Sequence, residues 1–473
     1  MAALFGADDL LSKRSETGER QPVILAGVFT RAFPSEEVFL HSMEELEELA
    51  KACGLYPVCT ITQKLPQTDR ALYVHHGKAQ EIAELVRNME AGRVIFNDTL
   101  SPSQIRNLQK ILRVPIIDRT RLILEIFETR ARTREAKLQV ELAKLQYLKP
   151  RLMGLWETQN RQGGASGSMS TRGEGEKQLE IDRRTIDHRL SELRKELDLV
   201  GRERGIQRSA RTHSSLPQVA LVGYTNAGKS TIMNGMIELW SGSRPEKKVY
   251  AEDMLFATLD TSVRRISVDK GREFLLSDTV GFIRDLPPSL VEAFRSTLEE
   301  ITQADLLVQT VDVSDPYHEE QMRATSRTIT ELGAGHIPMI TVFNKADQTE
   351  PAIPYPKRGL RESSIAGETN ENLYLCATQS SSIELLTNVS LEKLERKNVY
   401  REYLIPYPAG NVLTYLMQNA RIQSVSYTED GTFVSLSCAP VVAKKAERMV
   451  HQSEGGALKD WLRVANPAQQ TKK

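Results

Sequence analysis

Short apolar runs alternate with amphipathic stretches over the first 120 residues of the chain. Between the runs, residues 43–52 and 79–89 place apolar side chains at helical spacing, with charged side chains on the opposite face. Because strands and helices alternate, we expect a small parallel α/β sheet over residues 22–128, after a flexible N-terminus at 1–21. The runs that we interpret as strands are 23–29, 57–61, 71–74, 94–96 and 114–117.

Two long apolar stripes in residues 129–212 predict two helices. Pro150 interrupts the first stripe and is expected to kink its helix. The stretch between the stripes, 161–176, reads RQGGASGSMSTRGEGE and is too rich in glycine for a helix. We therefore expect an antiparallel helical hairpin with a mobile tip loop, whose stripes form its core. The first stripe comprises Leu138, Leu142, Leu145, Leu148, Leu152 and Leu155, and the second Leu179, Ile186, Leu190, Leu193, Leu197 and Val200.

An apolar strand at 219–222 leads into the sequence GYTNAGKS, and a helix is predicted from Thr231 onward. The spacing Gly-x-x-x-x-Gly-Lys-Ser is typical of a phosphate-binding loop, because glycines let successive backbone N–H groups converge on phosphate oxygens. We expect Lys229 to reach the terminal phosphates and Ser230 to ligate Mg²⁺, while the helix N-terminus adds positive charge. The predicted nucleotide contacts here are Gly223, Tyr224, Thr225, Asn226, Ala227, Gly228, Lys229, Ser230 and Thr231.

The segment DTVGF follows a strand at 274–276, at the distance that a GTP-binding domain requires. Asp278 would hold the hydration shell of the Mg²⁺, and Gly281 would offer its N–H to the γ-phosphate. Thr279 and Val280 complete the predicted contacts of this segment. Phe282 follows the glycine, where a polar residue would orient the attacking water. A phenyl ring cannot do so, and we expect a low unassisted rate.

A third segment, NKAD, follows the apolar strand 339–343 and predicts specificity for guanine. The carboxylate of Asp347 can accept two hydrogen bonds from the N1 and exocyclic amino groups of guanine, which adenine cannot donate. Asn344 precedes Lys345, which would cover the base. Backbone contacts from Cys376 and Ala377 would close the pocket. Together these segments predict a GTPase domain over residues 213–395.

The threonine that senses the γ-phosphate is expected in LFATLD, between the phosphate loop and DTVGF. Thr258 is the candidate, with Thr261 as a nearby alternative, and Phe256 and Ala257 lie beside it in the predicted nucleotide site. Residues 240–248 are polar and contain glycine and proline, which predicts an exposed, mobile loop. The candidate catalytic residues are Lys229, Thr258 and Gly281, and the candidate Mg²⁺ residues are Ser230, Thr258 and Asp278.

The last region, 396–466, predicts a small α+β domain, followed by a flexible tail at 467–473. A strand at 403–405, a helix at 411–417, two strands at 422–427 and 432–436, and a helix at 442–449 follow one another. The turn Glu429-Asp430-Gly431 joins the two strands. The whole chain is therefore predicted as multidomain α/β, in which the GTPase sheet is mostly parallel with helices on both faces.

Overall composition excludes several classes of protein. Lys and Arg number 62, and so do Asp and Glu, so total charge favours no partner. The four cysteines are Cys53, Cys59, Cys376 and Cys438, and they have neither metal-site nor disulfide spacing. No apolar run approaches the length of a membrane span, so we expect no stable membrane insertion. We expect a cytoplasmic monomer.

The charge is unevenly distributed along the chain. Residues 101–215 contain 24 Lys and Arg against 15 Asp and Glu, an excess of nine positive charges. A basic helical arm with a glycine-rich tip is suited to phosphate-rich surfaces such as RNA. A solvated basic helix face is the alternative. Trp156 is the aromatic residue nearest the tip, so base stacking is expected to be secondary to phosphate contact.

These motifs resemble the HflX-type translational GTPases over nearly the whole chain. The resemblance is carried by SPSQIRNLQK at 101–110, the segment 117–152, RQGG at 161–164, TRGEGEKQLEIDRR at 171–184 and AEDMLFATLD at 251–260. It implies that GTP-bound protein binds the large ribosomal subunit, with the hairpin tip near ribosomal RNA of the peptidyl-transferase region. It also implies splitting or rescue of stalled or idle ribosomes under stress. The RNA-contact candidates are Arg161, Gly163, Gly164, Arg172, Gly173 and Lys177.

The tip departs from the family pattern in ways that affect RNA docking. Glu174 stands where the family has proline, and Lys177 where it has threonine. A carboxylate at the tip would weaken proximity to phosphates, which Arg172 and Lys177 could offset. The interpretation is a ribosome-stimulated GTPase that uses GTP, GDP and Mg²⁺. The alternatives are a ribosome-assembly GTPase and a nucleotide-switched adaptor that binds a protein.

Overall fold

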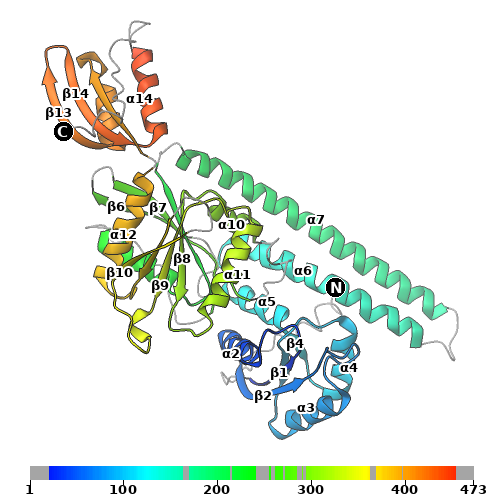
Figure 1. The fold of residues 1–473 in the computed structure, drawn as a ribbon. Helices are drawn as coiled ribbons and strands as arrows, with labels where there is room; N and C mark the ends of the chain where they lie inside the picture. Colours follow the sequence, from blue (N-terminus) through cyan, green and yellow to red (C-terminus); the bar gives the residue numbers. More distant parts are fainter. Residues whose placement is uncertain are drawn as a thin grey trace. The chain divides into compact units, whose positions relative to one another are not determined.

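The computed structural model divides the chain into two compact units (Figure 1). The first contains the chain up to residue 202, with the described parts of 252–260 and 283–297. The second contains the rest of the GTPase region and the C-terminal domain. The structure describes residues 21–162, 170–212, 216–240, 255–256, 262–269, 272–284, 290, 294–362, 369–396 and 398–453.

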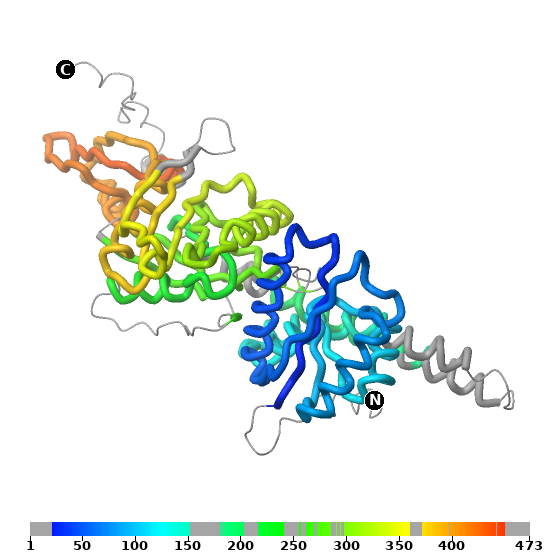
Figure 2. The backbone as a smooth tube through the Cα atoms, turned by 60° about the horizontal axis from the view of Figure 1, so that its bottom comes forward, coloured from blue at the N-terminus to red at the C-terminus, as the bar shows by residue number. Residues whose placement is uncertain are grey.

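A four-stranded parallel sheet in the order β2-β1-β3-β4 forms the centre of the first unit. Figure 2 traces its backbone in blue to cyan. Of its inner strands, β3 is buried throughout and β1 at all but its two end residues, as expected for a parallel sheet covered on both faces. This confirms the predicted small parallel α/β sheet. The strands are β1 (Pro22–Phe29), β2 (Tyr56–Lys64), β3 (Arg93–Phe96) and β4 (Ile116–Asp118), and the helices are α2 (Glu36–Ala52), α3 (His76–Asn88), α4 (Pro102–Leu112) and α5 (Arg119–Arg130).

The apolar run at 71–74 is not a strand, contrary to our prediction. It lies in a turn that a single antiparallel bridge closes between Asp69 and Tyr73. The carboxylate of Asp69 accepts hydrogen bonds from the N–H groups of Ala71 and Leu72, at 2.7 and 2.8 Å. An aspartate that binds the backbone two and three residues ahead favours a turn over an extended strand.

Two antiparallel helices form the predicted hairpin, α6 (Arg134–Gln162) and α7 (Ser170–Thr212) (Figure 1). Leu138 and Leu142 of the first stripe are buried, as are Ile186, Leu190 and Leu193 of the second. Ion pairs join the outer edges, including a two-pronged contact from Arg189 to Glu141 at 2.8 and 3.1 Å. The helix α6 continues through Pro150.

Part of the predicted tip loop is helical. Residues 161–162 are helical, and α7 already begins at Ser170, so Arg172, Gly173 and Lys177 lie on a helix. A glycine costs about 1 kcal/mol in a helix, and the glutamates and lysine around Gly173 and Gly175 are good helix formers that offset this cost. Residues 163–169, including Gly163 and Gly164, lie outside the described part.

A seven-stranded sheet in the order β10-β11-β9-β8-β5-β7-β6 forms the GTPase domain. Its five central strands are parallel, and the two edge strands β10 and β6 are antiparallel to their neighbours. The strands are β5 (Gln218–Gly223), β6 (Ser262–Asp269), β7 (Arg272–Asp278), β8 (Leu306–Asp312), β9 (Met339–Asn344), β10 (Lys357–Glu362) and β11 (Thr369–Tyr374).

Helices cover both faces of this sheet. The apolar sides of α8 and α12 share one core with β5, β8 and β9. On β8 the side chain of Gln309 points away from that core and donates to the Met322 carbonyl of α11, at 3.4 Å. Strand alternation therefore places α11 on the other face. The helices of this region are α8 (Lys229–Trp240), α10 (Arg295–Thr302), α11 (His318–Glu331), η1 (Ala346–Gln348) and α12 (Ser380–Glu395).

The C-terminal domain has the predicted order of strand, helix, hairpin and helix. Its sheet has the order β12-β14-β13, and α13 and α14 pack on it with a common core. Its elements are β12 (Val399–Ile405), η2 (Tyr407–Ala409), α13 (Gly410–Asn419), β13 (Arg421–Thr428), β14 (Gly431–Cys438) and α14 (Pro440–Ser453).

Candidate functional site

The loop GYTNAGKS lies at the carboxyl end of β5 and leads directly into α8. Gly223 and Gly228 have φ angles of +144° and +97°, a region that favours glycine. A Cβ atom would overlap the Thr310 carbonyl oxygen at the first position and the Asn344 side-chain amide at the second. The two glycines are therefore required by backbone conformation and by close packing.

Lys229 is buried beneath this loop, with 6% of its surface exposed. Its ammonium group donates to the carbonyl oxygens of Tyr224 and Gly223, at 2.6 and 3.1 Å. Burial lowers the pKa of Lys229 to about 8, and the nearby Asp278 carboxylate opposes this shift. An anion bound at the loop would favour the charged form, so Lys229 is held ready for a phosphate.

Nucleotide binding is therefore expected to take up a proton above pH 8. At pH 8.5 about 0.8 of the Lys229 groups are neutral before binding, and bound phosphates restore the ammonium ion. Titration calorimetry with GDP in two buffers of different ionisation enthalpy measures this uptake. We expect about 0.8 proton at pH 8.5 and about 0.1 at pH 7. Equal uptake at the two pH values would contradict the assignment.

The residues that suit Mg²⁺ meet beside the loop. The Ser230 hydroxyl donates to the Asp278 carboxylate at 2.7 Å, and Asp278 is fully buried. The buried Thr225 hydroxyl has no hydrogen-bond partner among the described residues. A hydroxyl and a carboxylate are oxygen ligands of the kind that Mg²⁺ prefers, so these residues fit the ion. Mg²⁺ would neutralise charge on the β- and γ-phosphates.

The segment DTVGF is joined to the phosphate loop by its backbone. The Phe282 carbonyl accepts from the Thr225 N–H at 2.8 Å, and the Phe282 N–H donates to the Gly223 carbonyl at 3.1 Å. Gly281 is consequently pressed against the loop, because a Cβ there would lie 2.8 Å from the Thr225 Cα and 3.1 Å from the Lys229 Nζ. The Phe282 ring is only 2% exposed.

Asn344 connects the phosphate loop to the predicted base pocket. Its side chain donates to the Ala227 carbonyl at 2.9 Å and accepts from the Ala377 N–H at 2.9 Å. Lys345 follows with a left-handed φ of 59°, and its ammonium lies 2.6 Å from a carboxylate oxygen of Asp312. The structure thus brings the loop, NKAD and the 376–377 segment together. Asp347 is exposed beside them.

Two residues of this arrangement escaped the sequence interpretation. Asp312 ends β8 and orients Lys345, while the Ser382 hydroxyl accepts from the Cys376 N–H at 3.2 Å. The position of Asp312 at the carboxyl end of a strand was a usable signal, because such ends line the site in parallel sheets. Ala257 and both candidate switch threonines lie outside the described residues. Phe256 is described, and it packs in the first unit.

Comparison with known proteins identifies the family. Models for the N-terminal part and the middle region of GTP-binding GTPases match residues 40–128 and 130–211. A third family model, described as "50S ribosome-binding GTPase", matches residues 218–345. GTPase HflX of Caldanaerobacter subterraneus subsp. tengcongensis is 38% identical, over 91% of this chain and 93% of the relative. The chain belongs to the HflX family of GTPases.

A second HflX relative gives the same result. GTPase HflX of Escherichia coli K12 is 38% identical, over 91% of this chain and 95% of the relative. A crystal structure of a GTP-binding protein from Sulfolobus solfataricus in complex with GDP is similar over 79% of this chain and 99% of that chain, with 21% identity and a TM-score of 0.39. The HflX chain binds guanine nucleotides and hydrolyses GTP. Among its described helices, none is long and apolar enough to cross a membrane.

Proposed function

We propose that this HflX GTPase acts in the cytoplasm, binds the large ribosomal subunit in its GTP form, and splits or rescues stalled or idle ribosomes. The observation that carries the proposal is the combination of a GTPase domain with a long basic hairpin. The excess of nine positive charges lies in residues 101–215, which include both hairpin helices. A surface rich in RNA phosphate suits such an arm.

The nucleotide site supports a switch that needs a partner. The γ-phosphate would be contacted by Lys229, by the N–H of Gly281 and by Thr258, and its loss on hydrolysis would release these contacts. Phe282 contributes a buried ring and no hydrogen-bonding group to orient water. We therefore expect slow unassisted hydrolysis, at or below about 10⁻⁴ per second, and acceleration by the ribosome.

Ribosome splitting is tested by mixing purified protein with intact ribosomes and following subunit dissociation by light scattering. A non-hydrolysable GTP analogue is expected to support dissociation, and GDP is not. Sucrose gradients of cell extracts identify the particle that the protein accompanies. Equal ribosome affinity with both nucleotides would contradict the switch, and exclusive association with immature subunits would favour an assembly role.

The hairpin's charge is tested by salt titration of binding to the large subunit. The double substitution Arg172→Ala and Lys177→Ala is expected to reduce the slope of the logarithm of the binding constant against the logarithm of the salt concentration by about one to two. The variant would contact fewer phosphates, so fewer counterions would be released when it binds. The matched control removes two exposed lysines of the α/β subdomain, Lys51→Ala and Lys64→Ala. An unchanged slope in the hairpin variant would favour a protein-binding adaptor.

A further inference from the structure

The helix α5 is buried on nearly all of its sides. From Arg119 to Phe127, Glu125 is the single residue that is not buried. A helix that is covered all round must contact more than one neighbouring layer. Its neighbours include α2, α6 and the strands β3 and β4. What lies at its two ends suggests a role beyond filling the core.

At the C-terminal end, the Phe127 ring packs against two aromatic rings from the GTPase sequence. It meets Phe256 edge-on with centroids 4.6 Å apart, and Phe294 at 5.1 Å. The three side chains are at most 4% exposed. Phe256 lies two residues before Thr258, and Phe294 lies thirteen residues after Gly281. Both segments that would respond to the γ-phosphate therefore hold an anchor on the same ring of α5.

The conformation of the first anchor is itself constrained. Phe256 has a φ of 56°, a left-handed backbone conformation that a bulky side chain rarely adopts and that persists only when the surroundings fix it. The second segment has a further attachment, because the Arg284 guanidinium lies over the Phe33 ring at 5.0 Å. Phe256, Phe294 and Arg284 therefore all have their aromatic contacts within the first unit.

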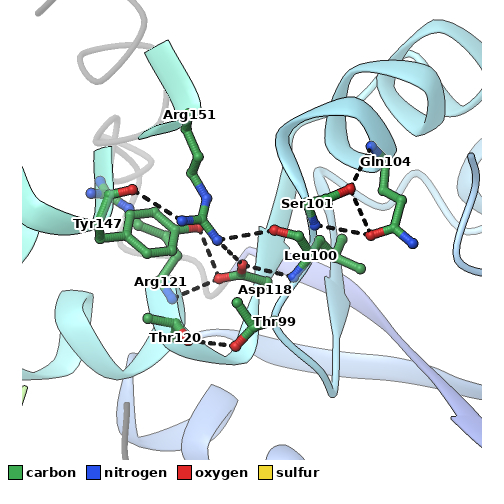
Figure 3. A network of polar contacts seen from close by, with 9 residues as sticks. All are labelled: Thr99, Leu100, Ser101, Gln104, Asp118, Thr120, Arg121, Tyr147 and Arg151. Atoms are coloured by element: carbon green, nitrogen blue, oxygen red, sulfur yellow. Dashed lines mark hydrogen bonds and ion pairs between the residues drawn. The ribbon is translucent and has the colours of Figure 1, made fainter. Parts of the chain in front are cut away.

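At the N-terminal end, Asp118 caps α5 and binds α6 (Figure 3). One carboxylate oxygen accepts from the Arg121 N–H at 2.9 Å and the Tyr147 hydroxyl at 2.8 Å. The other accepts from the Leu100 N–H at 3.1 Å and the Arg151 guanidinium at 2.8 Å. Asp118 is fully buried, so these contacts form a rigid connection between α5 and the middle of α6.

Arg151 strengthens this connection by two further kinds of contact (Figure 3). Its guanidinium lies over the Tyr147 ring, 3.4 Å from the centroid, and donates to the Leu100 and Tyr147 carbonyl oxygens at 3.0 Å each. The hairpin helix is thereby fixed both to α5 and to the segment that leads into α4. A displacement of α5 cannot leave α6 unaffected.

We propose that α5 couples the two switch segments to the helical hairpin, with Phe127 positioning the segments at one end and Asp118 fixing α6 at the other. The twelve-residue helix spans about 18 Å and is short enough to move as a rigid strut. A change in the switch segments on loss of the γ-phosphate would shift Phe127, and α5 would carry the shift to α6. Coupling of this kind acts in both directions.

Hydrogen-exchange mass spectrometry on the full-length protein tests the coupling without ribosomes. In the wild type, exchange of α6 amides is expected to differ by about fivefold or more between the GDP and GTP-analogue complexes. Phe127→Leu is expected to abolish this difference in α6 while GDP affinity and protection at the phosphate loop remain. Tyr147→Phe removes one hydrogen bond to Asp118 and is expected to reduce the difference partly.

Phe96→Leu is the matched control, since Phe96 is equally buried and meets the Tyr73 ring edge-on at 5.4 Å, away from the switch segments. It is expected to keep the wild-type nucleotide response. The proposal would be overturned by a wild-type α6 that exchanges equally with both nucleotides. A wild-type response in Phe127→Leu, or its loss in Phe96→Leu, would also overturn it. Failure to bind ribosomes would leave this result unaffected.

Discussion

Asp347→Asn is expected to lower the affinity for GTP and GDP by about 10³-fold and to create measurable binding of xanthosine nucleotides. The carboxylate would accept two hydrogen bonds from the N1 and exocyclic amino groups of guanine. An amide keeps one acceptor and turns its NH₂ group toward a guanine donor, so one charged hydrogen bond is lost and the other is weakened. Xanthine carries a carbonyl in place of the amino group and can accept from that NH₂.

The substitution isolates recognition of the base because Asp347 makes no side-chain hydrogen bond or ion pair within the described part of the chain. Its side chain is exposed, so the fold is expected to tolerate the change. Glu350→Gln, an exposed neutralisation in the same loop, is the control and is expected to bind GTP as the wild type does. Calorimetry with GDP and xanthosine diphosphate measures both effects. A loss of GDP affinity below tenfold would contradict the assigned role.

The elements with strong periodicity were predictable from the sequence, and those decided by side-chain hydrogen bonds were not. Buried strands such as β1 and β9 are continuous apolar runs, and the hairpin stripes repeat at helical spacing over many turns. The run at 71–74 looks the same locally. Its turn depends on the carboxylate of Asp69 binding the backbone, a contact that apolar spacing does not reveal.

In the glycine-rich stretch between the hairpin helices, composition predicted too little helix. Composition alone indicated a loop over 161–176, yet α7 begins at Ser170. The helix extends into this stretch because elongation of an existing helix is easier than nucleation, and it tolerates Gly173 and Gly175 between good helix formers. Residue propensity therefore assigned to a loop several residues that are helical, at 161–162 and from Ser170 onward.

The motifs of the candidate site were predictable from the sequence, and the side-chain contacts that join them were not. Spacing indicated the phosphate loop, DTVGF and NKAD, which the structure brings to one edge of the sheet. The contacts of Asn344 with Ala227 and Ala377, and of Asp312 with Lys345, join residues far apart in sequence. Such pairs follow from the strand order β11-β9-β8-β5, which motif spacing does not contain.

Gly281→Ala is expected to slow GTP hydrolysis by about 100-fold while GDP affinity stays within about threefold of the wild type. The added Cβ would lie 2.7 Å from the Thr225 Cγ2 and 2.8 Å from its Cα, so the segment has to move away from the phosphate loop. The Gly281 N–H then loses its position toward the γ-phosphate. GDP has no γ-phosphate and does not use this donor. Single-turnover hydrolysis and GDP calorimetry separate the two effects.

Gly77→Ala provides the control, because a Cβ at Gly77 meets no atom within 4 Å. It lies near the start of α3 and is expected to leave hydrolysis and nucleotide affinity unchanged. Equal losses of GDP affinity and hydrolysis in Gly281→Ala would indicate damage to the phosphate loop itself, since Thr225 and Lys229 border the same space. A wild-type hydrolysis rate in Gly281→Ala would show that the close approach of Gly281 to the phosphate loop has no part in the reaction.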